Sequence, residues 1–474
     1  MVMGELMQET DVLVIGSGPG GYSAAFRAAD LGLDVTMVDT APRPGGECLF
    51  RGCIPSKTLL YMAELIHDAE RAKEMGVAFG APVVDLESLR SWKEKVIDTL
   101  AGGLVTLSEK RGVQLLQGRA LFEAPDRVRL FDSDVSHIKF RRAVLATGSR
   151  PTPFLDADFS AGGRIMDASG ALSLADIPET LLVLGGGYVA LELGSVYAAL
   201  GSRVTIAVRS DRLLRGADSD LAAPLIRRLE NSFENILFNS QPAALSDDDT
   251  GVDITWSDDE IERPARFDRV LVAVGRQPNS ADLGLEYTGV EVDERGFVKV
   301  DEQQRTADEH ILAIGDVAGG PMLAHKAFHE GKVAAEVISG QPSAFDARAI
   351  PAIVYTDPQV AWAGLTEAQA EKEGRTVKIE RYPWKFSSRA VTMGATDGVT
   401  KILIEPETGR ILGLGITGRH TEGMISEGVL AIEMGALAQD LALSVHPHPT
   451  LSETVGEAAE IFLGSVTHML PKKS

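Results

Sequence analysis

The chain has 474 residues, with 68 acidic and 46 basic side chains that leave a formal net charge of −22. This charge repels nucleic acids and anionic membranes and argues against both as partners. The length suffices for roughly two to four domains with cores of their own. Two cysteines are too few for a fold held together by disulfides.

The apolar runs and the first residues predict where the protein resides. The opening segment, MVMGELMQET, has neither the basic start nor the apolar centre of a signal peptide. No apolar run approaches the ~18–20 residues that a membrane-spanning helix needs. Together with the low cysteine content, these observations predict a soluble, cytoplasmic protein.

Residues 11–39 show the pattern of a dinucleotide-binding unit. DVLVIG predicts a strand, GSGPGG a turn, the alanine-rich stretch that follows a helix, and DVTMVD a second strand. Gly16, Gly18 and Gly21 match G-x-G-x-x-G, which permits a tight turn, a close approach to pyrophosphate and close helix packing. Asp39 ends the second strand, where its carboxylate can accept hydrogen bonds from ribose hydroxyls. The pattern predicts a cofactor pyrophosphate at the helix N-terminus.

The segment GGECLFRGCIPSK, residues 45–57, contains both cysteines, Cys48 and Cys53. A metal centre needs about four ligands, and only His446 and His448 suggest themselves as completions. A structural bridge over so short an interval adds little loop entropy, and the predicted compartment argues against it. A redox pair without metal is therefore the favoured interpretation.

The residues around the cysteines support a reactive thiolate. The chain reads as helix from about residue 54, so Cys53 lies near a helix start, where the dipole lowers the pKa of a thiol. Lys57, one turn further along, is available to add positive charge. Gly45 and Gly46 leave room beside Cys48 for a ring or for backbone.

The same strand, turn, helix and strand return at 181–208. Gly185, Gly187 and Ala190 match the G/A variant of the fingerprint, which predicts a second dinucleotide site. Tyr188, at the start of the helix, is assigned to that site. The repeat therefore predicts two dinucleotide-binding units rather than one.

The second unit lacks the acid of the first. Counting from Ala190 as from Gly21 leads to Val208, which is followed by Arg209. A carboxylate here would repel a 2′-phosphate, whereas arginines favour one, and Arg212 and Arg215 are near in sequence. If Arg209 is merely exposed, the site accepts NAD without a ribose carboxylate. The choice between NAD and NADP stays open.

Three apolar strands end at glycines, where an open α/β sheet presents its ligand crevice. RAVLATGSRP and RVLVAVGRQP close the two units, and HILAIGDVAGG follows later in the chain. Asp316 in the last segment can accept a hydroxyl from the flavin sugar chain, or it caps a helix. The other residues assigned to these edges are Thr147, Gly148 and Ala324 for FAD and Gly275 for NAD(P).

These patterns predict an α/β fold with two Rossmann-like dinucleotide-binding domains and a C-terminal α+β interface domain. Residues 1–150 and 276–350 are assigned to the FAD-binding and central domain, 151–275 to the NAD(P)-binding domain, and 351–474 to the interface domain. From about residue 350 the glycine fingerprints stop, and AIVYTDPQVAWAGL and TKILIEPETGRILGLGITG predict antiparallel strands.

Four ordered motifs resemble those of the flavin disulfide oxidoreductases. They are GGxCxxxGCIPSK after the first fingerprint, the second fingerprint, AIGD and HPHPTLSE. The segments at 321–340 and 445–460 are most similar to the dihydrolipoamide dehydrogenases. Mercuric and high-molecular-weight thioredoxin reductases carry a C-terminal cysteine pair that this chain lacks, and glutathione reductases usually lack the paired His-Pro. The resemblance implies oxidation of dihydrolipoamide with FAD and NAD(P).

The resemblance also implies partners and residue roles. Cys48 would exchange with the substrate and Cys53 would face the flavin, while His448, oriented by Glu453, would be the base. In the family this histidine serves the cysteines of the partner subunit, which implies a homodimer. The implied outside partner is a lipoyl-carrying protein or a 2-oxoacid dehydrogenase complex.

Two further roles follow from the resemblance, and some alternatives stay open. Lys57 and Glu192 would pair near the flavin ring, which Tyr188 would cover until nicotinamide arrives. Glu47 and Phe50–Arg51 replace residues that are commonly small or polar, so an altered dithiol is possible. A glutathione-type, NADPH-dependent disulfide reductase and a redox sensor without turnover are the alternative functions.

Overall fold

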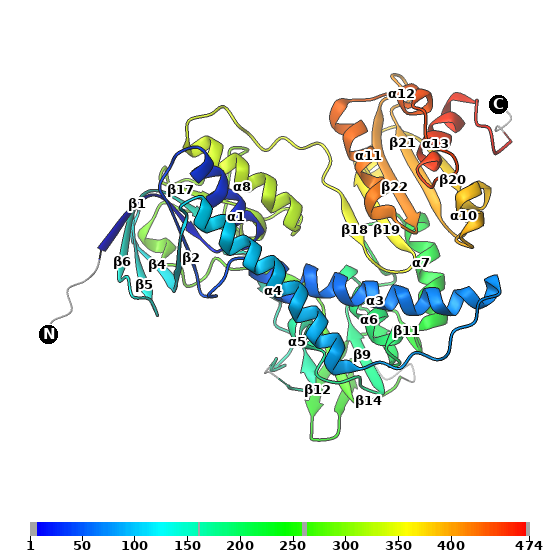
Figure 1. Cartoon of the computed structure of the whole chain (residues 1–474), viewed down its shortest axis with the longest axis horizontal. Helices are drawn as coiled ribbons and strands as arrows, with labels where there is room; N and C mark the ends of the chain where they lie inside the picture. The colour runs from blue at the N-terminus through cyan, green and yellow to red at the C-terminus, as the bar shows by residue number, and fades with distance from the viewer. Residues whose placement is uncertain (1–6, 160–161, 258–262, 471–474) are drawn as a thin grey trace.

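The computed structural model describes residues 7–159, 162–257 and 263–470. Residues 1–6 and 471–474, the outer ends of the first and last predicted domains, lie outside the described residues. Figure 1 shows three groups of elements, each built around a sheet. None of the helices in the described ranges combines the length and the apolar character that crossing a membrane requires.

The first sheet has seven strands in the order β3-β2-β1-β6-β5-β4, with β17 also paired to β6. Five of these strands run parallel: β1 Met7–Ile15, β2 Val35–Asp39, β3 Gln114–Gln117, β6 His137–Leu145 and β17 Ile311–Ala313. β4 Arg119–Ala124 and β5 Arg127–Phe131 form an antiparallel extension. The late strand β17 thus returns the chain to the first sheet.

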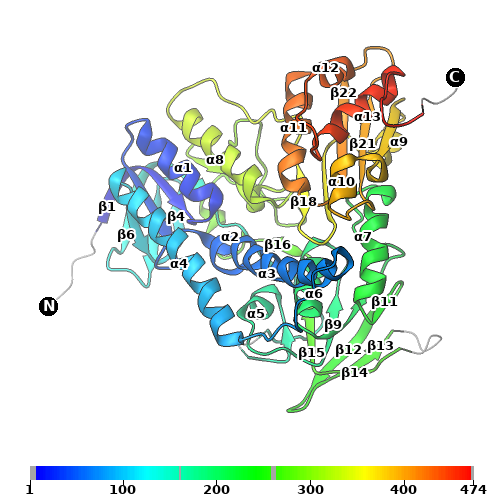
Figure 2. The same cartoon turned by 45° about the vertical axis from the view of Figure 1, so that its right-hand side comes forward.

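Two helices pack together on this sheet, α1 Pro19–Asp30 and α8 Ala324–Ile338 (Figures 1 and 2). Their contact is close because small residues face each other: a Cβ on Gly331 would lie 2.5 Å from the carbonyl oxygen of Gly20. The Ser23 hydroxyl donates to the carbonyl oxygen of Phe328 at 2.8 Å. Residues more than 300 positions apart in the sequence therefore hold the first fingerprint helix, α1, against α8.

The second sheet is all parallel, in the order β11-β10-β9-β15-β8. Its strands are β8 Ile165–Met166, β9 Thr180–Leu184, β10 Arg203–Ala207, β11 Asn235–Leu237 and β15 Arg269–Val272. Its helices include α5 Ala168–Ser173, α6 Tyr188–Ala199 and α7 Ser219–Ser232. An antiparallel ribbon of β12 Pro242–Asp247, β13 Val252–Trp256 and β14 Arg266–Phe267 adjoins it.

The chain crosses between the first two units through a short antiparallel pair, β7 Ser149–Pro151 and β16 Arg276–Pro278. Both predicted domain limits, 150 and 276, lie in this pair. The helices that carry the cysteine motif, α2 Gly46–Arg51 and α3 Cys53–Arg71, bridge the units. Leu59 of α3 is buried in the core of the second unit, beside residues of α6. The cysteines therefore lie between the two predicted nucleotide sites.

The C-terminal sheet is antiparallel, in the order β18-β19-β22-β21-β20. Its strands are β18 Ala352–Val354, β19 Gln359–Gly364, β20 Lys378–Pro383, β21 Val399–Ile404 and β22 Ile411–Gly418. Three helices, α11 Thr421–Met434, α12 Ala438–Leu443 and α13 Glu453–Leu463, contribute to one core with Ile402, Leu414 and Ile416. These helices therefore cover one face of the sheet.

The other face of this sheet meets α7 of the nucleotide unit. Because side chains alternate along a strand, Gly415 and Thr417 point away from the core that Leu414 and Ile416 enter. The Thr417 hydroxyl donates to the carbonyl oxygen of Leu221 on α7 at 2.6 Å. A Cβ on Gly415 would lie 2.3 Å from the Leu221 side chain, so glycine permits this contact.

Candidate functional site

Cys48 lies on α2 and Cys53 is the first residue of α3, with Gly52 as the break between the two helices. Both thiols are free and half-buried, and they are joined by a hydrogen bond. This bond and the charge of Lys57 together lower the pKa of Cys53 to about 7, against the opposing effect of burial. The same bond and burial raise the pKa of Cys48. At neutral pH Cys53 thus carries thiolate character and Cys48 stays a thiol.

The cysteine motif is seated directly on the first fingerprint. The Gly45 N–H donates to the carbonyl oxygen of Ser17 at 2.8 Å. Gly46 has φ +58°, and a Cβ there would lie 2.6 Å from the Cα of Gly18. Only glycine permits this approach, because both the backbone angle and the contact exclude a side chain.

Lys57 and Glu192 meet across the gap between α3 and α6. The Lys57 ammonium donates to Glu192 Oε2 at 2.8 Å and lies 4.5 Å from the ring centroid of Tyr355. Glu192 is 2% exposed, and its Oε1 accepts the backbone N–H of Tyr355 at 2.9 Å. Sequence analysis did not identify Tyr355, because nothing in the motif around it indicates chemistry. This pair holds a buried charge close to the thiols.

The first fingerprint has the geometry of a pyrophosphate cradle. Gly16 has φ +100°, and a Cβ on Gly21 would lie 1.9 Å from the carbonyl oxygen of Gly16, so helix and turn are in contact. A Cβ on Gly18 would lie 3.9 Å from its nearest neighbouring atom, so the backbone there is open to a ligand. No side chain caps the N-terminus of α1. Asp39 Oδ2 accepts both the N–H and the hydroxyl of Ser17 at 2.7 Å. Free helix amides and a carboxylate at the strand end fit FAD.

Asp316 lies within the 3-10 helix η3 Gly315–Ala318 rather than at its cap. Its Oδ2 accepts the Ser149 hydroxyl at 2.6 Å, and Ser149 Oγ accepts the Nε–H of Arg276 at 2.7 Å. The capping alternative is therefore wrong, since no cap bond is made. Ser149 and Arg276 were missed by sequence analysis, although both lie in the crossover segments that it singled out.

Three of the remaining predicted residues, Thr147, Gly148 and Gly275, directly flank the strands of the crossover pair in the chain. The Thr147 hydroxyl donates to the carbonyl oxygen of Asn279 at 2.7 Å. Gly148 has φ +72° and accepts the Asn279 N–H. Ala324 begins α8. Gly275 has φ +138° and its carbonyl oxygen accepts the Thr152 N–H.

The second fingerprint repeats the first. A Cβ on Gly185 would lie 2.2 Å from the carbonyl oxygen of Ala273, while the space around Gly187 is open. No side chain caps α6, and Ala190 is fully buried. Tyr188 is 39% exposed at the start of the helix, and burial raises its pKa to about 12, helped by the charge of Glu192. These features fit a second pyrophosphate.

The position of the missing acid is fixed by register. In the first unit, the residue before Asp39 pairs with the last residue of β1. In the second unit, the residue before Val208 pairs in the same way with the last residue of β9, so Val208 occupies the position of Asp39. Val208 is 6% exposed and packs against the turn at Gly186. Its side chain has no hydrogen-bond acceptor to offer a ribose.

His448 and Glu453 form a dyad on the C-terminal domain. His448 Nδ1 donates to Glu453 Oε1 at 2.8 Å, and Glu453 Oε2 accepts the Thr450 N–H at 2.7 Å. The His448 side chain is 60% exposed, and its Nδ1 is the ring nitrogen that contacts Glu453. A second dyad joins His446 to Glu427 of α11 at 2.8 Å, which sequence analysis did not anticipate.

The family model for pyridine nucleotide-disulphide oxidoreductases matches residues 10–331, and the dimerisation-domain model of the same family matches residues 350–459. The chain belongs to the pyridine nucleotide-disulphide oxidoreductase family.

Relatives and solved structures agree with this membership. Dihydrolipoyl dehydrogenases from Vibrio parahaemolyticus and Halobacterium salinarum are 43% and 42% identical, over 98% and 99% of this chain and 98% and 100% of theirs. The crystal structure of LpdA from Mycobacterium tuberculosis is similar with a TM-score of 0.87 at 25% identity, covering 95% of this chain and 99% of that one. RclA, an HOCl-induced flavoprotein disulfide reductase from Escherichia coli, has a TM-score of 0.84 at 25% identity, with coverage of 95% and 99%.

Membership confirms the predicted class of protein. This pyridine nucleotide-disulphide oxidoreductase has the expected α/β fold with two Rossmann-like domains and a dimerisation domain. It is an enzyme that uses FAD and NAD(P), as the two fingerprints predict. The resemblance stated from the motifs alone is also confirmed.

The oxidoreductase does not bring its two predicted catalytic groups together within one chain. Glu453 begins α13, on the face of the C-terminal sheet opposite to α7, whereas the cysteines lie at α2 and α3, between the two nucleotide units. Figure 2 shows α13 and α2 well apart. No hydrogen bond or ion pair among the described residues joins the His448 dyad to the cysteines.

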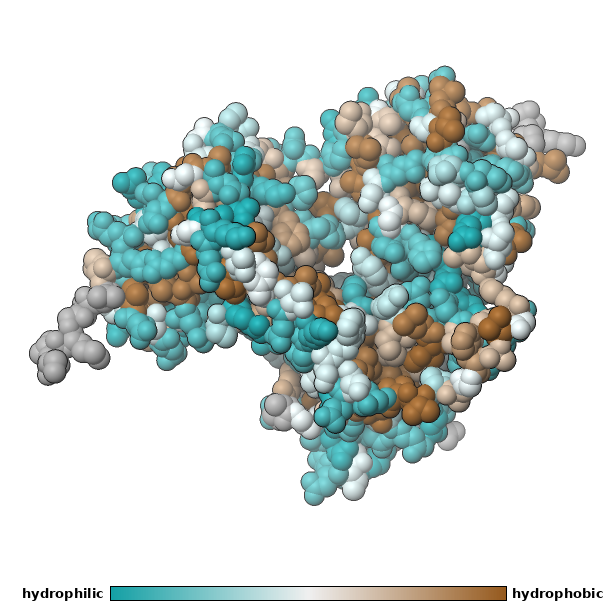
Figure 3. All heavy atoms as spheres, in the orientation of Figure 1, coloured by the Kyte–Doolittle hydropathy of each residue, from teal (hydrophilic) through white to brown (hydrophobic). Residues whose placement is uncertain are grey.

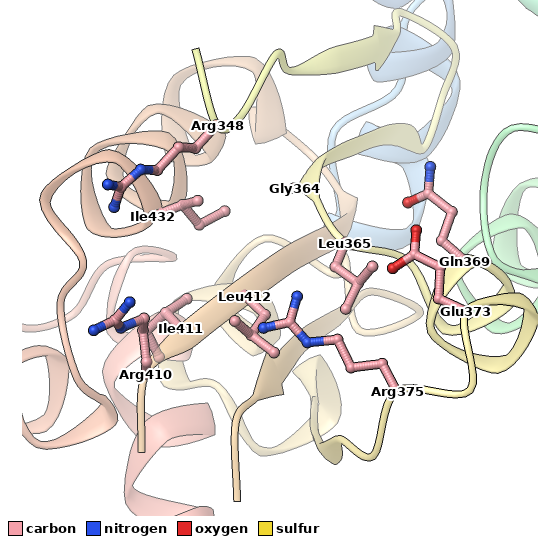
Figure 4. A pocket seen from close by; sticks show the side chains of 10 residues that line it. All are labelled: Arg348, Gly364, Leu365, Gln369, Glu373, Arg375, Arg410, Ile411, Leu412 and Ile432. Carbon is pink, nitrogen blue, oxygen red and sulfur yellow. The ribbon is translucent and has the colours of Figure 1, made fainter. Parts of the chain in front are cut away.

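Two other features of this oxidoreductase contain none of the predicted residues. A hollow of about 450 Å³ on the C-terminal domain is lined by arginines, Gln369, Glu373 and apolar side chains (Figure 4). Asp218, Asp220 and Glu367 cluster as metal ligands do, but the buried Lys401 ammonium lies 2.7 to 3.1 Å from all three. The lysine supplies the positive charge in that cluster.

Proposed function

We propose that the chain is a dihydrolipoyl dehydrogenase, which oxidises a dihydrolipoyl dithiol to its disulfide and reduces NAD(P)⁺ to NAD(P)H with release of one proton. The observation that carries this proposal is the pair of hydrogen-bonded thiols beside Lys57, with a His-Glu dyad on the dimerisation domain. The relatives at 41–43% identity support the substrate. Bound FAD supplies the two-electron chemistry between dithiol and nicotinamide.

The two cysteines take separate roles in thiol–disulfide exchange. A substrate thiolate attacks Cys48 Sγ of the oxidised pair, the Cys48–Cys53 bond breaks, and Cys53 leaves as a thiolate. The low pKa of Cys53 makes it the better leaving group. The second substrate sulfur then attacks the first, closing the lipoyl disulfide and releasing Cys48, which takes a proton. Lys57, paired with Glu192, stabilises the charge that remains on Cys53.

His448 moves the protons of this exchange. Glu453 accepts from its Nδ1, which fixes the tautomer and leaves Nε2 free to take a proton from the substrate dithiol. Because the dyad lies on the face of its sheet opposite to α7, we assign it to the cysteines of a second copy. The active unit is then a homodimer with two shared sites.

The surface of the C-terminal domain supports a second copy as partner. Large apolar side chains on and after α11 and α12 are strongly exposed in the single chain, and Figure 3 shows apolar side chains on this part of the molecule. They are Leu430 (63%), Met434 (76%), Leu443 (71%) and Val445 (98%). Such an apolar group beside the dyad fits burial between copies. A lipoyl-carrying protein or 2-oxoacid dehydrogenase complex in the cytoplasm is the outside partner that we propose.

Turnover by the holoenzyme tests the function. We expect oxidation of dihydrolipoamide coupled to NAD(P) reduction, with a loss of about a hundred-fold or more in His448→Gln. The matched control is His468→Gln, because His468 is another partly exposed histidine bonded to a glutamate. Faster turnover of glutathione disulfide with NADPH would favour the glutathione-type alternative. Absence of turnover with both substrates would favour a sensor.

A mixed dimer tests the shared site. Copies carrying Cys48→Ser are combined with copies carrying His448→Gln, each inactive alone. If the base serves the other subunit, each heterodimer contains one intact site and regains up to about half of the wild-type activity. If the base serves its own chain, both sites stay defective and no activity returns.

A further inference from the structure

Helix α8 carries a buried ion pair that the proposed mechanism does not use. The Lys326 ammonium lies 2.7 Å from Glu330 Oε1, one helical turn away, and the two side chains are 6% and 5% exposed. Removing two charges from water costs free energy, which their close pairing and further hydrogen bonds must offset. The other contacts of the pair therefore indicate what it holds in place.

Both side chains bond to the peptide groups of one residue, Gly315. Glu330 Oε2 accepts the Gly315 N–H at 2.7 Å, and the Lys326 ammonium donates to the Gly315 carbonyl oxygen at 3.5 Å. Gly315 has φ +73° and begins η3. The lysine stem also reaches the far end of this segment, because a Cβ on Gly320 would lie 3.1 Å from Lys326 Cε. The pair thus attaches both ends of residues 315–320 to α8.

Asp316 is the residue whose position this attachment determines. It follows Gly315 directly, and its Oδ2 accepts the Ser149 hydroxyl at 2.6 Å. Within the described ranges no hydrogen bond reaches its Oδ1. A carboxylate with one oxygen still available can accept a hydroxyl of the flavin sugar chain. The direction of that oxygen depends on how the preceding glycine is held.

The lysine keeps Glu330 in the form that this attachment needs. Burial raises the pKa of Glu330, whereas the Lys326 ammonium and the Gly315 N–H oppose the rise. An ionised carboxylate offers both of its oxygens as acceptors, here one to the ammonium and one to the peptide. Without Lys326 the buried carboxyl would gain a proton, and its hydrogen bond to Gly315 would weaken.

We propose that Lys326 and Glu330 are positioning residues for FAD, which hold Gly315 so that Asp316 faces the sugar chain of the bound flavin. The pair acts through Asp316 rather than by touching the flavin. The proposal deepens the proposed function at its flavin site. It rests on that function for the flavin contact of Asp316, and it does not depend on which dithiol is oxidised.

Release of FAD from the holoenzyme tests the proposal without turnover. The flavin that passes a protein-retaining membrane after dilution gives the release rate, and far-UV circular dichroism follows the folded protein. We expect release at least about ten-fold faster in Lys326→Met and in Glu330→Gln, because each loses a buried charge-assisted hydrogen bond. The double variant leaves no unpaired charge and should release FAD more slowly than either single variant. Glu336→Gln is the matched control, because Glu336 lies on the same helix in a partly exposed pair with Arg27, and it should stay within about two-fold of wild type.

A double-mutant cycle with Asp316→Ala tests whether the pair acts through Asp316. We expect Asp316→Ala alone to speed FAD release, and the addition of Glu330→Gln to change the rate by less than about two-fold more. Effects that multiply would make the pair merely structural and overturn the proposal. Unchanged release in both single variants of the pair overturns it too, as does release that only accompanies loss of the helical signal.

The outcomes separate this proposal from the proposed function. If the cycle behaves as expected but dihydrolipoamide is not oxidised, the positioning role stands and the proposed function fails. If dihydrolipoamide is oxidised while the effects in the cycle multiply, the proposed function stands and the positioning role fails.

Discussion

The carboxylate of Glu47 lies 3.4 Å from the guanidinium of Arg276, so the residue before Cys48 is held by charge to the strand that returns from the nucleotide domain. Arg51 approaches the same carboxylate at 3.4 Å. Arg276 also donates to Ser149, whose hydroxyl donates to Asp316. These contacts connect the cysteine helix with the carboxylate proposed for the flavin.

Replacing Glu47 therefore has a small effect on dithiol choice. Its charge is already compensated by two arginines, and partly exposed ion pairs contribute only about 0–1 kcal/mol. We expect Glu47→Gln to change kcat/KM for dihydrolipoamide less than about five-fold, because the carboxylate is not free to repel a substrate. Steady-state kinetics with a neutral and an anionic dithiol check this. A selective gain of ten-fold or more for the anionic dithiol would show that Glu47 acts on substrates directly.

Removing the Lys57 ammonium raises the pKa of Cys53 above about 7, because this charge stabilises the thiolate. In Lys57→Met we expect slower alkylation of Cys53 by iodoacetamide at pH 7, with the rate recovering as the pH is raised. The alkylation rate of the reduced enzyme across pH 5 to 9 measures the shift. An unchanged profile would contradict a role for Lys57 at the thiolate.

The Lys57→Met variant also leaves the buried carboxylate of Glu192 without its ion-pair partner. Glu192 is 2% exposed and loses its ion-pair partner, so we expect a loss of about 1–3 kcal/mol in the free energy of unfolding. The double variant Lys57→Met with Glu192→Leu removes both charges, and we expect it to lose less free energy of unfolding than Lys57→Met alone. Denaturant unfolding of the two variants separates stability from thiol reactivity.

A substitution at Gly46 tests whether close contact between the cysteine motif and the first fingerprint is needed for FAD binding. Gly46→Ala adds a Cβ 2.6 Å from the Cα of Gly18 and forces φ +58° on an alanine, so the turn that receives the pyrophosphate must shift. We expect purified Gly46→Ala to contain little FAD, measured by absorbance at the flavin bands. Gly32→Ala is the matched control, because Gly32 has φ +86° with open space around it, and it should retain FAD. Equal FAD loss in both would mean that backbone strain, not the contact, is responsible.

The His446–Glu427 pair makes stability depend on pH. The hydrogen bond to Glu427 raises the pKa of His446, with smaller help from Glu453. A raised pKa in the folded state stabilises the protein below the unfolded value of about 6.5, and this stability disappears as the pH rises through the folded value. We expect Glu427→Gln to be less stable than wild type by about 1 kcal/mol at pH 6, and the difference to shrink by pH 9. Denaturant unfolding at both pH values checks this, and a difference that grows with pH would contradict it.

The local chemistry of this protein was readable from its sequence. The fingerprint glycines are required by local structure, because the tight turn and the close helix packing exclude a side chain. The positive φ of Gly16 and Gly185 shows this. Cys48, Cys53 and Lys57 lie within ten residues, so their relation follows from two consecutive helices, α2 and α3, that meet at Gly52. The fold class followed because the two strand, turn and helix patterns and the antiparallel strands are periodic in sequence.

Other relations were decided only by the tertiary structure. Arg276 reaches Glu47 across more than two hundred residues, and the Tyr355 backbone completes the pairing of Glu192. That His448 lies away from the cysteines of its own chain follows from which face of the C-terminal sheet meets α7. No local pattern specifies such contacts, because they depend on how separately formed elements pack. Sequence specifies which groups are present and how each turn or helix begins, and packing determines which distant groups meet.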